Sequence, residues 1–126
     1  MIHVSAVDFK VSCAELLPGS YVVTLGGDAD PYAVPSLARE LERLTDLGAR
    51  EIVVDLLDVP FIDSTVLGVL LKTARRLRAD GGDFVLVSDD PRVLRPFEIT
   101  GLSAHFRFEK TLAAAVERAL ENAYRA

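Results

Sequence analysis

The sequence predicts a single α/β domain over residues 1–126, with a mixed β-sheet that opens with a β-hairpin and about four helices packed mainly on one face. Two observations carry this prediction. Two strand-like segments stand together near the start of the chain and are separated only by turn residues. After them, short apolar runs alternate with segments of helical periodicity, and no linker, repeat or low-complexity segment interrupts them.

The opening hairpin consists of residues 9–16, which alternate in polarity, and residues 21–25, which are rich in β-branched side chains. The turn residues Pro18 and Gly19 stand between them. A helix follows, for which Asp30 is expected to serve as the cap and Pro31 as part of the first turn, before Gly48 ends it. Its apolar positions recur at helical spacing: Val34, Leu37, Ala38, Leu41, Leu44 and Leu47.

Residues 51–56 form an apolar run interrupted by Asp55, which is typical of a buried central strand in a parallel arrangement. A loop then leads to a second helix, predicted from about residue 64 to residue 79. The predicted buried stripe of this helix consists of Leu67, Leu70, Leu71, Ala74 and Leu77. Residues 84–87 are predicted to form another buried strand.

A third helix is predicted after residue 90, with Asp90 as its cap, Pro91 in its first turn and Gly101 as its stop. Pro96 lies inside it and should kink or shorten it, because proline removes a backbone hydrogen bond. Residues 106–108 form a short strand, and a helix with apolar positions between residues 112 and 123 closes the chain.

Composition and charge exclude several classes of function. The net charge of −5 and the pI of about 5.0 argue against a nucleic-acid partner, since such proteins neutralise phosphates with cations. The one cysteine, Cys13, excludes an intrachain disulfide and a thiolate metal site. No signal peptide is recognisable and no apolar run reaches the roughly 20 residues that span a bilayer. We expect a cytoplasmic protein without membrane insertion, metal or cofactor.

Two polar clusters follow predicted strands. The first is Gly27-Asp-Ala-Asp30, which contains Asp28 and Asp30, and the second is Asp63-Ser64-Thr65 at the start of the second helix. If the two strands are neighbours in a parallel sheet, both clusters lie at its carboxyl edge, where α/β proteins usually place function.

Ser64 is the most informative residue of the two clusters. A serine at a helix start ordinarily caps backbone N–H groups, although Asp63 could take that role instead. Val69 is predicted to lie opposite the buried stripe and Val66 to one side of it, so that apolar side chains stand beside a hydroxyl on the outer face. This arrangement suggests a protein-docking surface. The alternative is that neighbouring segments cover both valines.

The segment from residue 52 to residue 71 joins a strand ending in Asp55-Leu56, through a short apolar loop, to Asp63-Ser-Thr-Val-Leu-Gly68. This pattern resembles the signature of the STAS domain of bacterial anti-sigma-factor antagonists, and Gly27-Asp-Ala-Asp30 matches the family's Gly-x-x-Asp before the first helix. The resemblance spans nearly the whole chain. The family usually has glycine where this chain has Val66, a side chain that could crowd a kinase approaching Ser64.

The resemblance implies a partner-switching function. The unphosphorylated protein would bind an anti-sigma factor that is also a serine kinase, so that the sigma factor is released. Phosphorylation of Ser64, with Thr65 as runner-up, would end this binding, and a serine phosphatase would reset the protein. The implied partner-binding residues are Asp28, Asp30, Asp63, Ser64, Thr65, Val66 and Val69.

Two rivals belong to other classes. A hydrolase would need a base beside Ser64, but the chain has only His3 and His105 and no Gly-x-Ser-x-Gly elbow. Asp55 and Lys110 imitate parts of an aspartate-phosphorylated receiver, together with Asp28 and Asp30, yet the opening hairpin argues against that fold.

A third alternative shares the fold. STAS domains also act, without phosphorylation, as scaffolds of stress-signalling complexes or as small subunits of lipid-transport systems. Val66 keeps this alternative open, because it departs from the phosphorylated consensus.

Overall fold

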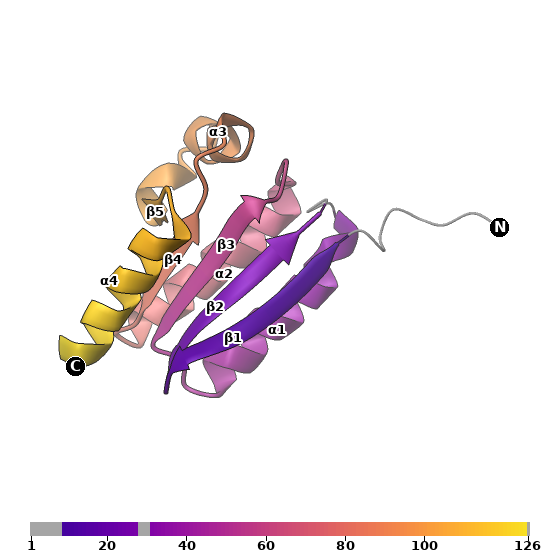
Figure 1. Ribbon diagram of the computed structural model, residues 1–126. Helices are drawn as coiled ribbons and strands as arrows, with labels where there is room; N and C mark the ends of the chain where they lie inside the picture. Colours follow the sequence, from indigo (N-terminus) through magenta and orange to yellow (C-terminus); the bar gives the residue numbers. More distant parts are fainter. Residues whose placement is uncertain (1–8, 28–30, 126) are drawn as a thin grey trace.

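The computed structural model describes residues 9–27 and 31–125. Its five-stranded sheet has the order β1-β2-β3-β4-β5, with β1 antiparallel to β2 and the other neighbours parallel (Figure 1). The strands are β1 Lys10–Leu17, β2 Ser20–Gly26, β3 Glu51–Asp58, β4 Asp83–Val87 and β5 Arg107–Glu109. The helices are α1 Val34–Asp46, α2 Ser64–Ala79, α3 Pro91–Ile99 and α4 Leu112–Arg125, with 3₁₀ turns η2 Pro31–Ala33 and η3 Leu102–His105. The predicted mixed sheet and opening hairpin are confirmed.

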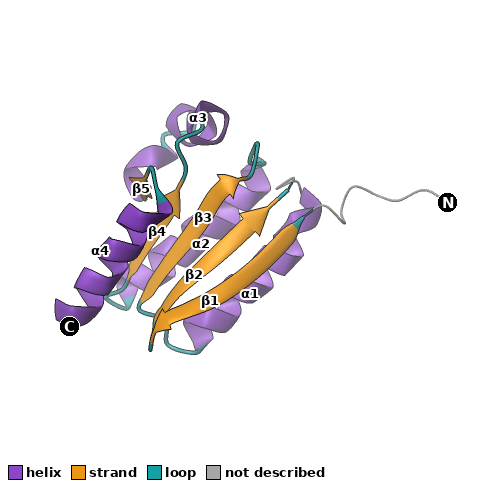
Figure 2. Cartoon of the chain, in the orientation of Figure 1, coloured by secondary structure: helices purple, strands orange, loops and turns teal. Residues whose placement is uncertain are grey.

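The sheet separates two hydrophobic clusters. The larger cluster lies between the sheet and α1 and α2, and it also takes in Val93 and Phe97 of α3. The smaller cluster lies on the opposite face, where Ala115 and Ala119 of α4 pack against valines of the strands. Figure 2 shows α1 and α2 behind the sheet and α4 in front of it. The helices therefore pack mainly on one face, as predicted, with α4 as the exception.

β3 occupies the centre of the sheet because it can be buried on both faces. Every residue from 51 to 56 is buried, and the strand pairs with β2 on one side and β4 on the other. Asp55 is tolerated there, at 8% exposure, because its carboxylate accepts a hydrogen bond of 2.9 Å from the backbone N–H of Leu57. The prediction of a buried central strand is confirmed.

α1 begins later than predicted. Residues 31–33 form the 3₁₀ turn η2, and the N-cap residue of α1 is Ala33, which makes no side-chain capping bond. The predicted cap, Asp30, lies outside the described residues. At the other end, Leu47 follows the helical spacing of the apolar positions but does not lie in the core. Leu47 is 63% exposed because it is the C-cap residue, after which the chain turns at Gly48 with φ of +86°.

α3 runs through Pro96 and ends three residues later, so it is a short helix of 9 residues. Asp90 caps it as predicted, accepting a hydrogen bond of 2.9 Å from the N–H of Arg92. Phe97 anchors the helix: its ring makes edge-on contacts with Phe106 and Phe108, each at a centroid distance of 5.2 Å. This aromatic packing holds the C-terminal half of α3 against the core.

Gly82 allows the backbone at the start of β4 to lie close to the backbone of Arg50. A β carbon at this position would lie 2.4 Å from the carbonyl oxygen of Arg50, which accepts a hydrogen bond of 2.8 Å from the N–H of Asp83. We therefore predict that Gly82→Ala lowers the free energy of unfolding by about 1–3 kcal/mol, measured by urea denaturation. If the free energy of unfolding of Gly82→Ala equalled that of wild type, the close approach of residue 82 to the carbonyl oxygen of Arg50 would not require glycine.

The control for that experiment is a helical glycine in open space. No atom lies within 4 Å of the β carbon that an alanine would add at Gly68. Gly68→Ala is therefore expected to raise the free energy of unfolding by about 0.5–1 kcal/mol, the usual difference between the two residues inside a helix.

Candidate functional site

The candidate site lies at the carboxyl edge of the sheet, where β3 ends and α2 begins. The N–H of Gly27 donates a hydrogen bond of 3.3 Å to the carbonyl oxygen of Asp58, so the chain leaves β2 beside the end of β3. Val59 and Ile62 are buried and hold the loop between β3 and α2 against the core. Ser64 is the first residue of α2. Asp28 and Asp30, predicted to belong to this site, lie outside the described residues.

Asp63 caps α2. Its backbone is extended, with φ of −78° and ψ of 154°, and its carboxylate accepts a hydrogen bond of 2.8 Å from the N–H of Thr65. The same carboxylate oxygen accepts the hydroxyl of Thr65. These bonds, with a further one from the N–H of Ser64, hold the pKa of Asp63 below its ordinary value. The carboxylate of Asp63 and the hydroxyl of Thr65 are therefore both engaged in the cap of α2.

The hydroxyl of Ser64 takes no part in this cap. Ser64 is exposed, and within residues 9–27 and 31–125 its hydroxyl makes no hydrogen bond. Capping, the usual role of a serine at a helix start, therefore does not account for this residue. The hydroxyl stands at the positive end of the α2 dipole, where it is open to a partner or to a modifying enzyme.

The sequence left open whether Val66 lies on the outer face of α2 or is covered by neighbouring segments, and the structure shows the second, because its side chain is fully buried. α2 packs against α1 as well as against the sheet, and this second contact turns its buried stripe toward Val66 and Thr73. Val66 belongs to the larger hydrophobic cluster. A valine at this position therefore fills the core and cannot crowd a molecule that approaches Ser64.

Val69 lies beside α1 and is half-buried, so the structure gives it only part of the exposure that was predicted. It lines a cavity of about 120 Å³ between the two helices, together with Ala38 of α1. Gly68, which ends the signature segment but was not predicted as a site residue, is exposed one turn after Ser64. The sequence signal for this residue was a glycine inside a helical pattern, where glycine destabilises the helix and usually has a packing or functional reason.

Exposed apolar side chains gather at the same edge. Tyr32 in η2, Leu57 near the end of β3 and Phe61 in the loop before α2 are 78%, 45% and 42% exposed. All three come from segments that follow or end the strands at the carboxyl edge. Apolar groups exposed at the same edge of the sheet as an open hydroxyl are typical of a protein-docking surface.

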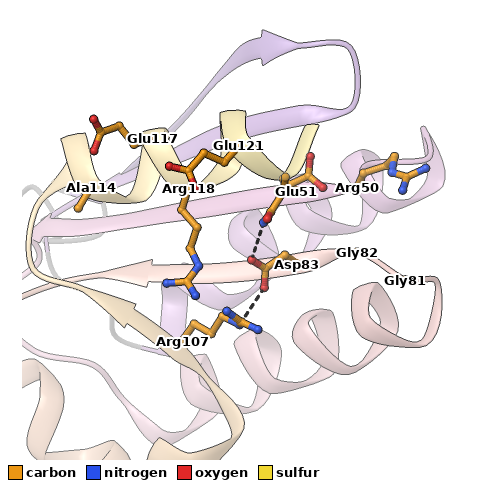
Figure 3. A pocket seen from close by; sticks show the side chains of 11 residues that line it. Arg50, Glu51, Gly81, Gly82, Asp83, Arg107, Ala114, Glu117, Arg118 and Glu121 are labelled. Carbon is orange, nitrogen blue, oxygen red and sulfur yellow. Dashed lines mark hydrogen bonds and ion pairs between the residues drawn. The ribbon is translucent and has the colours of Figure 1, made fainter. Parts of the chain in front are cut away.

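A second cavity, of about 760 Å³, lies at the opposite edge of the sheet (Figure 3). Asp83 there forms an ion pair of 3.3 Å with Arg107 and accepts a hydrogen bond of 3.1 Å from Asn122. The cavity opens near Gly81, beyond the C-terminal end of α2, so the 16 residues of this helix place it about 24 Å from Ser64. It is therefore separate from the candidate site.

The structure also bears on the rival functions. A receiver is excluded, because β1 and β2 form an antiparallel hairpin and Asp55 lies buried in β3. Among the described residues the one histidine, His105, is in η3 and makes no hydrogen bond to Ser64. The described part of the chain holds no cluster of potential metal ligands and no helix long and apolar enough to cross a membrane.

The profile of the STAS domain matches residues 14–115, and the chain therefore belongs to the STAS domain family, as the sequence resemblance implied. The anti-sigma-B factor antagonist of Staphylococcus aureus (strain NCTC 8325 / PS 47) is 38% identical over 82 residues, which cover 65% of this chain and 76% of that protein. The anti-sigma-B factor antagonist of Bacillus subtilis (strain 168) is 38% identical over 80 residues, or 64% of this chain and 72% of that one.

Solved structures share the fold. An anti-sigma factor antagonist from Mycobacterium paratuberculosis superimposes with a TM-score of 0.79 and 27% identity, covering 88% of this chain and 93% of that one. The antagonist SpoIIAA in its unphosphorylated form gives a TM-score of 0.78 at 24% identity, covering 89% of this chain and 97% of that one. The phosphorylated form of SpoIIAA from Bacillus gives 0.70 at 24% identity, with 86% and 98% covered.

Asp63→Asn tests the electrostatic part of the cap, because asparagine also caps helices but carries no charge. The ionised carboxylate stabilises the fold fully above the unfolded-state pKa of about 3.9, and this contribution is lost as pH falls through the lower folded-state pKa. The stability difference between wild type and Asp63→Asn should therefore shrink between about pH 6 and about pH 2 in chemical unfolding experiments.

The matched control is Asp89→Asn, because Asp89 is exposed and makes no hydrogen bond within the part of the chain that the structure describes. Its substitution removes one exposed carboxylate that caps no helix, and it should change stability little. If the effect of Asp63→Asn were independent of pH, the carboxylate would not act through its charge.

Proposed function

We propose that this protein is an anti-sigma-factor antagonist that changes partners when Ser64 is phosphorylated. In its unphosphorylated form it binds an anti-sigma factor with serine-kinase activity, so that the sigma factor is released. A serine phosphatase then restores the unphosphorylated form. The observation that carries the proposal is the exposed Ser64 hydroxyl, which makes no hydrogen bond in the described chain while Asp63 and Thr65 satisfy the helix cap.

The arrangement of the cap favours Ser64 over Thr65 as the phosphoacceptor. The Thr65 hydroxyl donates to Asp63, so modification of Thr65 would break a bond that begins α2. Modification of Ser64 breaks no side-chain bond in the described structure. Ser64 is therefore the residue of the two whose modification costs the fold less.

A phosphate on Ser64 would change the surface more than it would change the fold. It adds a charge of about −1.5 to −2, which the dipole of α2 stabilises at the N-terminal end of the helix. The fold common to the two solved forms of SpoIIAA supports this point. A partner that had accepted a neutral hydroxyl beside the carboxylate of Asp63 would now meet a strongly negative group, and like-charge repulsion would release it.

The exposed apolar side chains supply affinity in the unphosphorylated state. Tyr32, Leu57 and Phe61 offer a partner apolar area that stays in water when the protein is alone. Their burial would keep Ser64 against the kinase while the complex lasts. We propose that Asp63, Val69 and Gly68 belong to the same contact surface, and that Asp28 and Asp30 extend it.

A STAS module that works without phosphorylation is the second candidate, as a scaffold or a small subunit of a stress-signalling or lipid-transport complex. The sequence argument for it was that Val66 departs from the phosphorylated consensus. Because Val66 is buried in the core and does not crowd Ser64, this departure leaves the Ser64 hydroxyl open, and we infer that the phosphorylated antagonist is the better supported function.

Ser64→Asp is predicted to weaken binding to the cognate anti-sigma factor at least about a hundredfold, which corresponds to about 2.8 kcal/mol. The added carboxylate imitates part of the phosphate charge at an unchanged fold. Ser64→Ala should still bind, because only an unbonded hydroxyl is removed. Isothermal titration calorimetry with the purified anti-sigma factor gives both affinities, and equal binding of Ser64→Asp and wild type would contradict the proposal.

The position of the phosphate is tested separately. After incubation with the anti-sigma kinase and ATP, intact-mass measurement should find one phosphate on wild type and on Thr65→Ala, and none on Ser64→Ala. A phosphate that persists on Ser64→Ala and disappears from Thr65→Ala would move the site to Thr65.

A further inference from the structure

α2 is a basic helix in an acidic chain. The net charge of the protein is −5, yet α2 holds four of the 14 lysine and arginine side chains and none of the 19 acidic ones. The four are Lys72, Arg75, Arg76 and Arg78, and all of them are exposed. Such a concentration of one sign on one helix requires an explanation.

Contacts within the protein explain only one of the four. Arg76 forms an ion pair of 2.8 Å with Asp46 of α1. Lys72, Arg75 and Arg78 make no ion pair or side-chain hydrogen bond with any residue that the structure describes. Three exposed cations on one helix are thus free to bind something else.

The helix dipole does not account for the whole set. It favours cations in the last turn of a helix, where Arg76 and Arg78 lie, and its effect falls off before Lys72. Lys72 stands three and four residues before Arg75 and Arg76, so like charges are neighbours on the helix surface and repel one another. The fold therefore tolerates this arrangement rather than gaining from it.

The exposed face of α2 connects these cations to the candidate site. Ser64, Gly68, Lys72 and Arg75 follow one another at intervals of four, four and three residues, which places them along one side of an α-helix. All four are exposed. Gly68, in open space, keeps the middle of this face flat at a cost to helix stability, which suits a partner that approaches closely.

We propose that Ser64, Gly68, Lys72 and Arg75 form one docking surface, the α2 stripe, and that it receives an acidic face of the anti-sigma factor. This inference rests on the proposed function and adds the chemistry of the partner: carboxylates opposite Lys72 and Arg75. Lys72 is about 12 Å from Ser64 along the helix axis, farther than the screening length of about 8 Å at physiological ionic strength. A phosphate on Ser64 therefore leaves the attraction at Lys72 and Arg75 largely intact.

The two ends of the α2 stripe then have separate kinetic roles. The cations steer the partner toward the surface and raise the association rate. The state of Ser64 determines how long the complex lasts, because close contacts act mainly on the dissociation rate.

A protein partner fits these charges better than a nucleic acid. Acidic side chains of α1 flank the cations: Glu42 lines the same cavity as Lys72, and Asp46 pairs with Arg76. A uniform polyanion would meet these carboxylates as well as the cations, whereas a protein surface of mixed charge can match both.

The test measures association and dissociation rates with the purified anti-sigma factor by stopped-flow mixing, from low to physiological salt. The double variant Lys72→Glu/Arg75→Glu should associate at least about tenfold more slowly at low salt and lose most of its salt dependence. Its dissociation rate should change less than about threefold. The control Arg39→Glu/Lys110→Glu makes the same change in net charge at exposed cations outside α2, and it should behave as wild type within about twofold.

The outcomes separate this inference from the proposed function. If the double variant associates as fast as wild type while Ser64→Asp still releases the partner, the α2 stripe is not a docking surface and the switch at Ser64 stands. If both double variants slow association equally, only net charge matters and the inference fails. If wild type, but not Lys72→Glu/Arg75→Glu, binds a DNA duplex as tightly as the anti-sigma factor, the stripe is a nucleic-acid surface and the inference is overturned.

Discussion

The hydrogen bonds that the Asp63 carboxylate accepts from Thr65 are the interaction on which the site depends. These bonds cap α2 without the side chain of Ser64. The Ser64 hydroxyl therefore stands at the helix N-terminus and makes no hydrogen bond in the described chain. A serine that capped its own helix would lose that bond when modified. On the proposed function, this division of roles between neighbouring residues would let the protein carry or lack a phosphate at similar cost to its stability.

The sheet fixes the position of the α2 cap. β3 is buried on both faces and pairs with two parallel neighbours, so its end cannot move without disturbing the core. Val59 and Ile62 attach the loop that follows to the same core, and the side chain of Val66 locks the first turn of α2 against it. The result is an open hydroxyl on a rigid base, which suits control by surface charge without a large conformational change.

Much of the fold could be predicted because its signals are local. The hairpin, the order of elements and the cap at Asp90 follow from alternation, periodicity and turn residues within a few positions. What the sequence left open concerns packing between distant segments: a helical wheel for α2 contains no information about α1, which packs against α2, or about the core cluster that buries Val66. The exposure of Leu47 was missed for a related reason. Periodicity does not show where a helix ends, and Leu47 is the C-cap residue of α1.

The site was predicted more by resemblance than by physics. From the residues alone capping was the default explanation of Ser64, and the geometry of Asp63 and Thr65 shows that they form the cap without it. The most direct test of the account is the affinity of the anti-sigma factor for wild-type protein before and after stoichiometric phosphorylation, each measured by calorimetry. We predict that the phosphorylated protein binds at least about a hundredfold more weakly while its circular dichroism spectrum is unchanged. Equal affinities for the two forms would contradict the central claim that a charge on Ser64 controls this surface.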